Sequence, residues 1–441
     1  MSGPDVIVIG AGVAGLTVAR DLTASGQRVL LLEARGRLGG RVMTHHTPDG
    51  PIELGAEFVH GAVEEILGVA ARAELPLRET DRSSAPEPRG GSGPRTDFFS
   101  AIDALLAHAS GGDDESFQHL VERVDVDAGT KARGLALVEG YHAADPAKIS
   151  VQSLLDNTAA DERPGAERQF RFIRGYDSLV NALFDQAERE LCTVQLGAVT
   201  TAIAWRQGHA IVRTTAGAEF AAPRVVVTVP LGVLKAGAID FSPRLPGKED
   251  ALRRLEMGAA ARVSLQFEHD AWAGRDAFSR DGFLFTGEPP FPVWWISHPA
   301  PRPVVTGWAG GRRALALATL GESKRVGVAL EALGAALAVD ASRLRGELRG
   351  GFCHDWQSDP FARGAYSYAG VGGRNAGTEL AAPVDSTLFF AGEATQSDGR
   401  NATVHGAIAS GQRAAKQVLA ASGGDVPRPR VLSSKPPPST T

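Results

Sequence analysis

The sequence predicts an α/β fold with a Rossmann-like parallel sheet and a second, mixed α+β region whose sheet is mainly antiparallel. Three observations support this prediction. An apolar run at 6–9 leads into three glycines, a second apolar run at 28–32 ends in Glu33, and longer strand-like segments lie between 258 and 311. With 441 residues, 43% of them hydrophobic, the chain is long enough for two domains.

The first glycines predict a strand, a tight turn and a helix that bind a pyrophosphate. Gly10 permits the turn and Gly12 lets the backbone approach the phosphates. Gly15 lets the helix that starts near Val13 pack closely on the strand. The first amides of that helix, including those of Val13 and Ala14, then point at the phosphates together with the positive end of the helix dipole.

The residues after the second strand indicate which dinucleotide binds. Glu33, 18 residues after the last of the three glycines, can accept a hydrogen bond from a ribose hydroxyl and would repel a 2'-phosphate. FAD or NAD is therefore expected, not NADP, with Ala34 and Arg35 in the same site. Gly40 and Arg41 follow in an RLGGR segment that allows close backbone approach and offers a charge to a pyrophosphate; this extension resembles FAD-binding flavoproteins.

Several further segments carry a more specific resemblance. They are IELGAEFVHG at 52–61, TVPLGVLKAG at 228–237, DPFARGAYSY at 359–368, LFFAGE at 388–393 and NATVHGAIASGQRAA at 401–415. In this order they resemble the flavin-dependent amine oxidases, which include polyamine oxidases, monoamine oxidases and lysine-specific histone demethylases. The resemblance implies an FAD-dependent enzyme that oxidises an amine, either a polyamine or another primary or secondary amine.

The resemblance also implies which residues hold the cofactor. Segment 52–61 lies along the isoalloxazine, Glu393 bonds a ribityl or ribose hydroxyl, and the helix that opens near Thr403 points its positive end at the flavin pyrimidine. FAD should be bound non-covalently, because Ser367 occupies the position where monoamine oxidases attach FAD to cysteine. Beyond the glycine motif and its extension, the expected cofactor-binding residues are Gly55, Ala56, Glu57, Val199, Val229, Trp356, Gly392, Glu393, Thr403 and Val404.

The expected reaction transfers a hydride equivalent from the carbon beside the amine nitrogen to flavin N5, giving an imine that hydrolyses to a carbonyl product. By resemblance, Tyr368 and Thr403 flank the substrate and His60 lies at the substrate channel. Arg262 occupies the position of a lysine that many relatives bond through water to N5. Reoxidation by O2, with release of H2O2, is expected, although the arginine leaves open another acceptor.

Other functions remain open at this stage. A flavin-dependent amine dehydrogenase, an L-amino acid oxidase or a desaturase could share the fold, and a non-catalytic flavin-binding interaction protein would bind FAD without turning over. An L-amino acid oxidase needs an arginine for the substrate carboxylate. Arg400, in a DGRN turn that departs from the family pattern, could supply it or could face solvent; solvent exposure is the expected state of a charged loop residue.

The pattern along the chain gives discontinuous domains. An FAD-binding domain takes 1–75, 190–256 and 352–421, and a substrate-binding domain takes 76–189 and 257–351. Residues 98–144 read as helices, 194–229 as short strands and 258–272 as one long alternating strand. Residues 81–97 read as a mobile surface loop and 422–441 as a disordered tail.

The composition of the chain limits the binding partners and the cellular location that we expect. The net charge is -5 without a basic stripe, so no nucleic acid is expected, only a small-molecule amine and O2. No signal sequence or long apolar run is found, which predicts a cytoplasmic protein that does not bind a membrane. Cys192 and Cys353 are expected to be reduced thiols, without metal-ligand spacing, and no metal site is predicted. The oligomeric state is left open.

Overall fold

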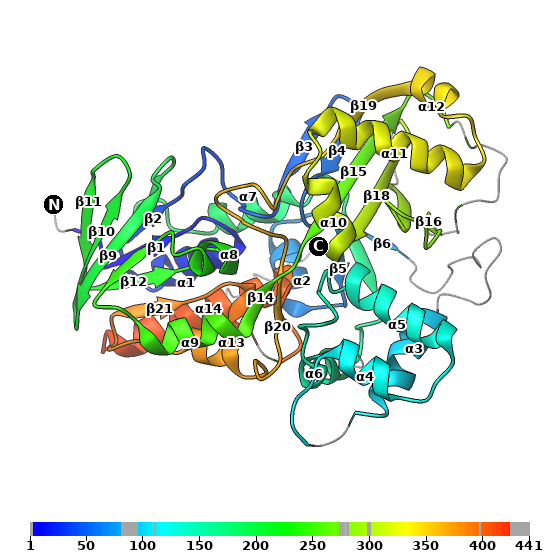
Figure 1. Cartoon of the computed structure of the whole chain (residues 1–441). Helices are drawn as coiled ribbons and strands as arrows, with labels where there is room; N and C mark the ends of the chain where they lie inside the picture. Colours follow the sequence, from blue (N-terminus) through cyan, green and yellow to red (C-terminus); the bar gives the residue numbers. More distant parts are fainter. Residues whose placement is uncertain are drawn as a thin grey trace, which may run out of the picture.

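The computed structural model describes residues 3–80, 96–109, 112–161, 163–270, 272, 278, 282–297, 301–396 and 398–423. The chain forms two lobes side by side (Figure 1), which we call the parallel-sheet lobe and the antiparallel-sheet lobe. Most of the predicted mobile loop, 81–95, and most of the predicted tail, 424–441, lie outside the described residues. No described helix is long and apolar enough to cross a membrane.

The parallel-sheet lobe is built on the strands that the glycine motif predicts. Its sheet has the order β21 (Leu388–Phe390), β12 (Arg224–Val227), β1 (Val6–Ile9), β2 (Val29–Leu32) and β8 (Cys192–Gln195). All pairs are parallel. Every residue of β1 and β2 is buried, as expected of apolar strands covered on both faces. The predicted α/β class with a Rossmann-like sheet is confirmed.

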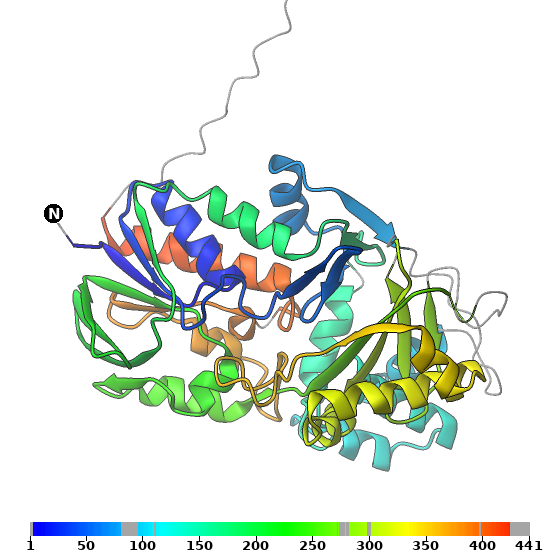
Figure 2. The ribbon, with the colours of Figure 1, turned by 90° about the horizontal axis from the view of Figure 1, so that it is seen from above.

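Layers on both faces bury this sheet. Helices α1 (Val13–Thr23), α7 (Asp177–Asp185) and α14 (Val404–Ala421) cover one face and lie side by side (Figure 2). The other face packs against a second sheet and short helices. Their bounds are β9 (Thr200–Arg206), β10 (His209–Thr214), β11 (Glu219–Ala222), β13 (Asp240–Ser242), α8 (Leu231–Lys235), α9 (Pro246–Arg254), α13 (Ala376–Ala381) and the 3-10 helix η1 (Glu393–Thr395).

Helices α1 and α14 pack closely because Gly411 has no side chain. A Cβ at that position would lie 2.6 Å from the Ala14 carbonyl oxygen. The first and the last described helix of the chain therefore share one interface.

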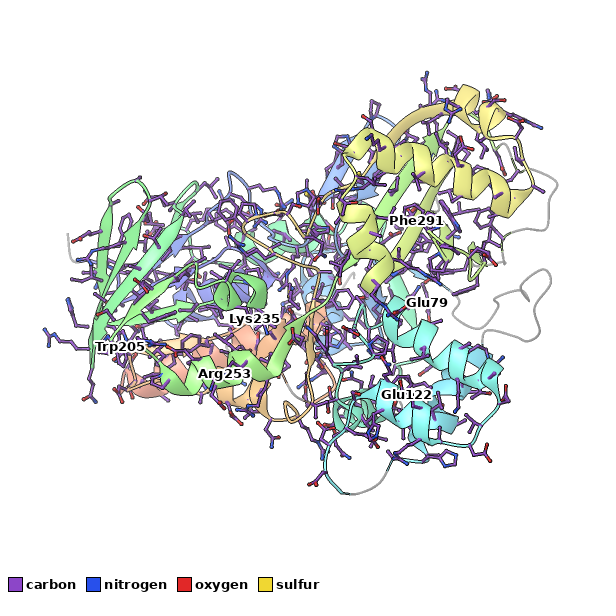
Figure 3. The ribbon with its side chains drawn as sticks, in the orientation of Figure 1. Glu79, Glu122, Trp205, Lys235, Arg253 and Phe291 are labelled. Carbon is purple, nitrogen blue, oxygen red and sulfur yellow. The ribbon has the colours of Figure 1, made fainter. Side chains whose placement is uncertain are left out.

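The antiparallel-sheet lobe matches the predicted sheet. Its strands have the order β16 (Phe283–Phe285), β17 (Val293–Ser297), β18 (Val304–Gly310), β15 (Ala260–Phe267) and β19 (Leu348–Phe352), and all pairs are antiparallel. Helices α10 (Gly311–Ala318), α11 (Glu322–Leu337) and α12 (Ala341–Glu347) supply the other side of its core, in which Phe291 is buried (Figure 3). β15 is shorter than the predicted strand and is buried at every position, so burial does not alternate along it.

A helical layer completes this lobe, as the apolar spacing at 98–144 predicts. It consists of α3 (Thr96–Leu106), α4 (Phe117–Arg123), α5 (Ala128–Gly140) and α6 (Val151–Asp161), which share one apolar cluster. Two details correct the predictions. Residues 96 and 97 open α3 and do not belong to a loop. The segment after Pro230 forms the short helix α8, where a loop was expected.

Short elements join the lobes. They are β3 (Thr44–Thr47) with β4 (Gly50–Glu53), β5 (Val59–His60) with β7 (Gln169–Phe172) and β6 (Leu77–Thr80), β14 (Leu255–Met257) with β20 (Ser367–Ala369), and α2 (Glu64–Arg72). α7, which the predicted boundaries assign to the substrate-binding domain, packs against α1 in the parallel-sheet lobe. The exact domain boundaries stay a prediction.

Candidate functional site

One cavity of about 920 Å³ runs from the first glycine turn to the aromatic face of the antiparallel sheet. Every residue predicted to bind cofactor or substrate lines it except Gly15. The lining therefore brings together positions that are hundreds of residues apart, including Gly12, Glu33, Arg262 and Tyr368.

The three glycines of the first turn, Gly10, Gly12 and Gly15, have different roles. Gly10 adopts φ +101°, a conformation that favours glycine. A Cβ on Gly15 would lie 1.9 Å from the Gly10 carbonyl oxygen, so Gly15 serves helix packing and is absent from the lining for that reason. A Cβ on Gly12 would meet nothing within 4 Å and would project into open space at the start of α1. The space beside Gly12 can therefore hold a phosphate, which the free amides and the positive dipole end of α1 would stabilise.

Glu33 is buried at the carboxyl end of β2, with 3% of its surface exposed. Its two carboxylate oxygens accept hydrogen bonds from the Ala11 amide at 2.7 Å and the Arg35 amide at 2.8 Å. Each oxygen retains a further lone pair for a hydroxyl donor. The guanidinium of Arg35 pairs with Asp359 at 2.7 Å. The backbone amide of Arg35, and not its charge, therefore contributes to the predicted cofactor site by orienting Glu33.

Val199 lines the same end of the cavity. Its amide donates to the Gly197 carbonyl at 3.2 Å and its carbonyl accepts from Thr215 at 2.9 Å. The backbone contact to adenine that the resemblance implies stays a prediction, since the amide already has a weak local partner.

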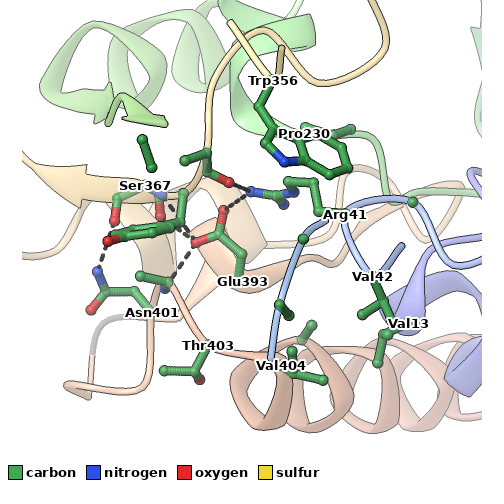
Figure 4. Close-up of a pocket in the computed structure, with 18 of the residues that line it drawn as sticks. Val13, Arg41, Val42, Pro230, Trp356, Ser367, Glu393, Asn401, Thr403 and Val404 are labelled. Atoms are coloured by element: carbon green, nitrogen blue, oxygen red, sulfur yellow. Dashed lines mark hydrogen bonds and ion pairs between the residues drawn. The ribbon is translucent and has the colours of Figure 1, made fainter. Parts of the chain in front are cut away.

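Glu393 is the centre of a polar network in the middle of the cavity (Figure 4). Its carboxylate accepts from Arg41 at 2.8 Å, from the Ser367 hydroxyl at 2.6 Å and from the Ala402 amide at 2.9 Å. Arg41 also donates to the Ala365 carbonyl. The network ties the loop after β2 to β20 and to the start of α14, so Glu393 fixes the shape of the site.

The start of α14 opens on the cavity at Thr403 and Val404. The Thr403 hydroxyl donates to the Arg400 carbonyl at 2.7 Å and accepts from the Gly406 amide at 2.9 Å. The hydroxyl is therefore used as a helix cap. The positive end of the α14 dipole still favours negative charge in the cavity.

Arg262 and Glu57 form a buried pair in the cavity wall. Arg262, 4% exposed, donates to Glu57 at 2.7 Å and to the Gly55 carbonyl at 2.9 Å, and its guanidinium lies 5.6 Å from the Trp295 ring centre. Trp295 donates to Glu57 at 3.0 Å, and Arg171 lies 3.4 Å from it. Burial opposes ionisation of Glu57, but the two arginines outweigh it and lower its pKa.

The sequence does not identify the partner of Arg262. The family resemblance gives Arg262 the position of a lysine that is bonded through water to flavin N5, and in the structure its guanidinium pairs with the carboxylate of Glu57. Likewise Glu57, predicted only as part of the cofactor site, is an acid held between two arginines. Both side chains line the cavity, and the catalytic role of Arg262 stays a prediction.

Aromatic rings line the far end of the cavity. Tyr368 is buried, burial raises its pKa to about 12, and its hydroxyl accepts from the Asp145 amide at 3.4 Å. Trp295 lines the cavity while its neighbour Trp294 is fully buried in the core of the lobe. The alternation of a strand assigns the two tryptophans to opposite faces, and this signal was present in the FPVWW segment. Trp308 and Tyr366, which also line the cavity, were missed.

Three histidines line the cavity. His60 packs with its ring centre 6.1 Å from that of Tyr141. Burial lowers the pKa of both His142 and His405 to about 4, so these two are neutral at physiological pH.

Arg400 is neither free nor fully solvated. It pairs with Glu65 at 2.8 Å and with Asp398 at 2.7 Å. The expectation that it only faces solvent is wrong, because both carboxylates hold it at the cavity wall. With two acids beside it, Arg400 has no surplus charge for a substrate carboxylate.

The residues present fit FAD. The open cradle at Gly12, the buried acid Glu33 and the continuous cavity give a dinucleotide a phosphate site, a ribose acceptor and space for a ring system. Among the described residues, no group of three or more histidine, cysteine or acidic side chains could hold a metal ion.

Comparison with known proteins agrees with this geometry. The profile of a family described as "Flavin containing amine oxidoreductase" matches residues 13–128 and 96–419. "Polyamine oxidase 3" of Oryza sativa subsp. japonica is 29% identical, over 94% of this chain and 89% of that protein. "Lysine-specific histone demethylase 1 homolog 1" of Arabidopsis thaliana is 30% identical over 94% of this chain but only 52% of that protein.

Solved structures share the fold. Cyclohexylamine oxidase from Brevibacterium oxydans superposes with a TM-score of 0.80 at 21% identity, covering 95% of this chain and 99% of that one. Wild-type putrescine oxidase bound to putrescine gives a TM-score of 0.78 at 21% identity, with the same coverage. At this identity the superpositions establish the fold of both lobes.

Proposed function

Since the chain belongs to the flavin-containing amine oxidoreductase family, we propose that it oxidises an amine to an imine with non-covalently bound FAD, and that O2 reoxidises the flavin. The observation that carries the proposal is the single cavity that joins a dinucleotide cradle to an aromatic pocket. When bound, FAD supplies the acceptor for the hydride equivalent that leaves the carbon beside the nitrogen.

The protein's own residues would bind and orient the reactants. Gly12 and the first turn of α1 would hold the pyrophosphate, and Glu33 would accept from a ribose hydroxyl. The start of α14, at Thr403, would stabilise negative charge in the middle of the cavity. The Glu393 network would keep the loop of Arg41 and the start of α14 in fixed positions.

The aromatic end would exclude water and confine the amine. Tyr368, Trp295 and Trp308 line the cavity with aromatic side chains that carry no charge at neutral pH. An amine bound against these aromatic rings loses its proton more readily, because burial disfavours the charged ammonium form and lowers the pKa of the amine. The neutral amine is the reactive form, so the wall itself promotes the reaction.

FAD is expected to leave the protein on acid precipitation. Ser367 has no thiol and its hydroxyl donates to Glu393, while Cys192 and Cys353 do not line the cavity. The supernatant should hold all the flavin, measured by its absorbance at the visible band. Flavin that stays in the washed pellet would contradict non-covalent binding.

Tyr368→Ala is expected to slow anaerobic flavin reduction by about 10- to 100-fold, because the amine is no longer confined. FAD content should stay at one per chain. Tyr368→Phe is the matched control, since it removes only a hydroxyl whose contact with Asp145 is 3.4 Å long, and it should stay near the wild-type rate. Equal rates in all three proteins, by stopped flow, would remove Tyr368 from the site.

The decisive test of the function is anaerobic titration of the holoprotein with a panel of amines. Bleaching of the flavin band by an amine, and its return on admitting O2, would support amine oxidation with O2 as acceptor. A flavin that bleaches but returns only with an artificial acceptor would support a dehydrogenase. A flavin that no amine or amino acid bleaches would contradict the proposal.

A further inference from the structure

The charges in the cavity wall carry information on the substrate. Five carboxylates line the cavity, and one of them, Glu33, lies at the dinucleotide end. The other four each have an arginine partner at 2.7 to 2.9 Å: Glu393 with Arg41, Glu57 with Arg262, Glu65 with Arg400 and Glu139 with Arg312. Apart from Glu33 at the dinucleotide end, no carboxylate among the described lining residues is without an arginine partner.

The wall also carries positive charge beyond these pairs. Arg313 lines the cavity and forms no ion pair with any described residue. Arg171 does not line the cavity, but it lies 3.4 Å from Glu57 and adds a second positive charge beside that carboxylate. His142 and His405 are neutral and do not change this balance. The substrate end of the cavity is therefore aromatic and, on balance, positive.

A second ammonium group would be poorly accommodated in such a wall. The reacting nitrogen enters as the neutral amine, so its charge does not need a partner. A distal ammonium of a diamine or polyamine keeps its charge at neutral pH, and a buried charge without a partner is strongly disfavoured. An aromatic wall does attract one cation, but Arg262 already lies over Trp295.

We propose that the substrate is a monoamine with an apolar or aromatic body, and that the ion-paired carboxylates of the wall exclude diamines and polyamines. This inference rests on the proposed amine oxidation and deepens it. It separates this chain from the relatives that are named for polyamine and putrescine substrates.

The test compares monoamines with a diamine and a polyamine by anaerobic stopped flow on the FAD-loaded protein, and hexylamine and 1,6-diaminohexane form a pair of equal length. Hexylamine and benzylamine should reduce the flavin with a second-order rate constant at least about 30-fold above those of 1,6-diaminohexane and spermidine. Equal or faster reduction by the diamine would overturn the monoamine assignment alone. Failure of every amine to reduce a fully bound flavin would overturn the proposed function as well.

A variant tests the cause of the preference. Arg312 is 74% exposed and does not line the cavity, whereas its partner Glu139 does and is 17% exposed. Arg312→Gln should free the Glu139 carboxylate and raise the rate constant for 1,6-diaminohexane about 10-fold, with that for hexylamine unchanged. An unchanged diamine rate constant would count against the proposal.

Arg345→Gln is the matched control. It breaks an exposed pair with Glu331, at 2.9 Å, that does not line the cavity. Both rate constants should stay at the wild-type values. A rise for the diamine in this variant too would show a general charge effect and contradict the role given to Glu139.

Discussion

Gly12→Ala is expected to give a folded protein without cofactor, whereas Gly15→Ala is expected to give no folded protein. A methyl group at Gly15 would lie 1.9 Å from the Gly10 carbonyl oxygen, a backbone atom that cannot move away as a flexible side chain could. The substitution should cost at least about 4 kcal/mol of unfolding free energy. At Gly12, with φ -72°, alanine is unstrained and meets no atom, so stability should change by less than about 1 kcal/mol.

The methyl group of Gly12→Ala nevertheless enters the space that a pyrophosphate would need. FAD affinity should fall by at least about 100-fold, measured by flavin fluorescence in a titration of the apoprotein. Gly247→Ala serves as control because its Cβ also meets nothing within 4 Å but lies away from the cavity. A yellow, wild-type-like Gly12→Ala protein would contradict the placement of the phosphates.

Arg262→Met is expected to lower the free energy of unfolding by about 3 to 5 kcal/mol, because it leaves the buried carboxylate of Glu57 without its closest partner. Arg262→Lys should recover part of this loss, since it keeps the charge but cannot reach both Glu57 and the Gly55 carbonyl in one plane. Urea unfolding of the holoproteins measures both effects.

The double variant Arg262→Met with Glu57→Gln separates pairing from packing. It removes the buried charge as well as its partner, and it should be more stable than Arg262→Met alone. Stopped-flow reoxidation of the same variants tests the catalytic role. If Arg262 acts on the flavin, reoxidation by O2 should change in both single variants. Wild-type reoxidation in both, with only stability lowered, would make the arginine a purely structural residue.

The fold was predictable to the extent that local pattern determines it. The glycines after Val6–Ile9 specify a turn and a helix within a few residues, and the structure confirms both. The long run at 258–272 predicts a strand but not its burial on both faces. That burial depends on α10 and α11 on one side and the cavity on the other. Pro230 predicts a loop after the strand, but in the structure it stands just before α8, where its missing N–H removes no hydrogen bond within the helix.

The site was less predictable, because its charges are paired over long distances in the sequence. Arg262 and Glu57 lie 205 residues apart, and Arg41 and Glu393 lie 352 apart. No periodicity in the sequence reports such a pair. The positions were found from motifs that resemble a family, but the partners were not. The proposal of a monoamine substrate depends on those partners, so it required the structure.

The close contact of α1 with α14 has a consequence for synthesis. The sheet order β21-β12-β1-β2 places residues 388–390 and 224–227 beside the first strand, and Gly411 closes the last described helix onto the first. A nascent chain cannot complete this lobe until α14 has left the ribosome, since long-range pairs form only when both members are present. During most of translation, β1 and α1 therefore lack their later partners, and their apolar faces stay exposed. We therefore expect the nascent N-terminal strand and helix to be prone to aggregation until residues 388–421 have been made.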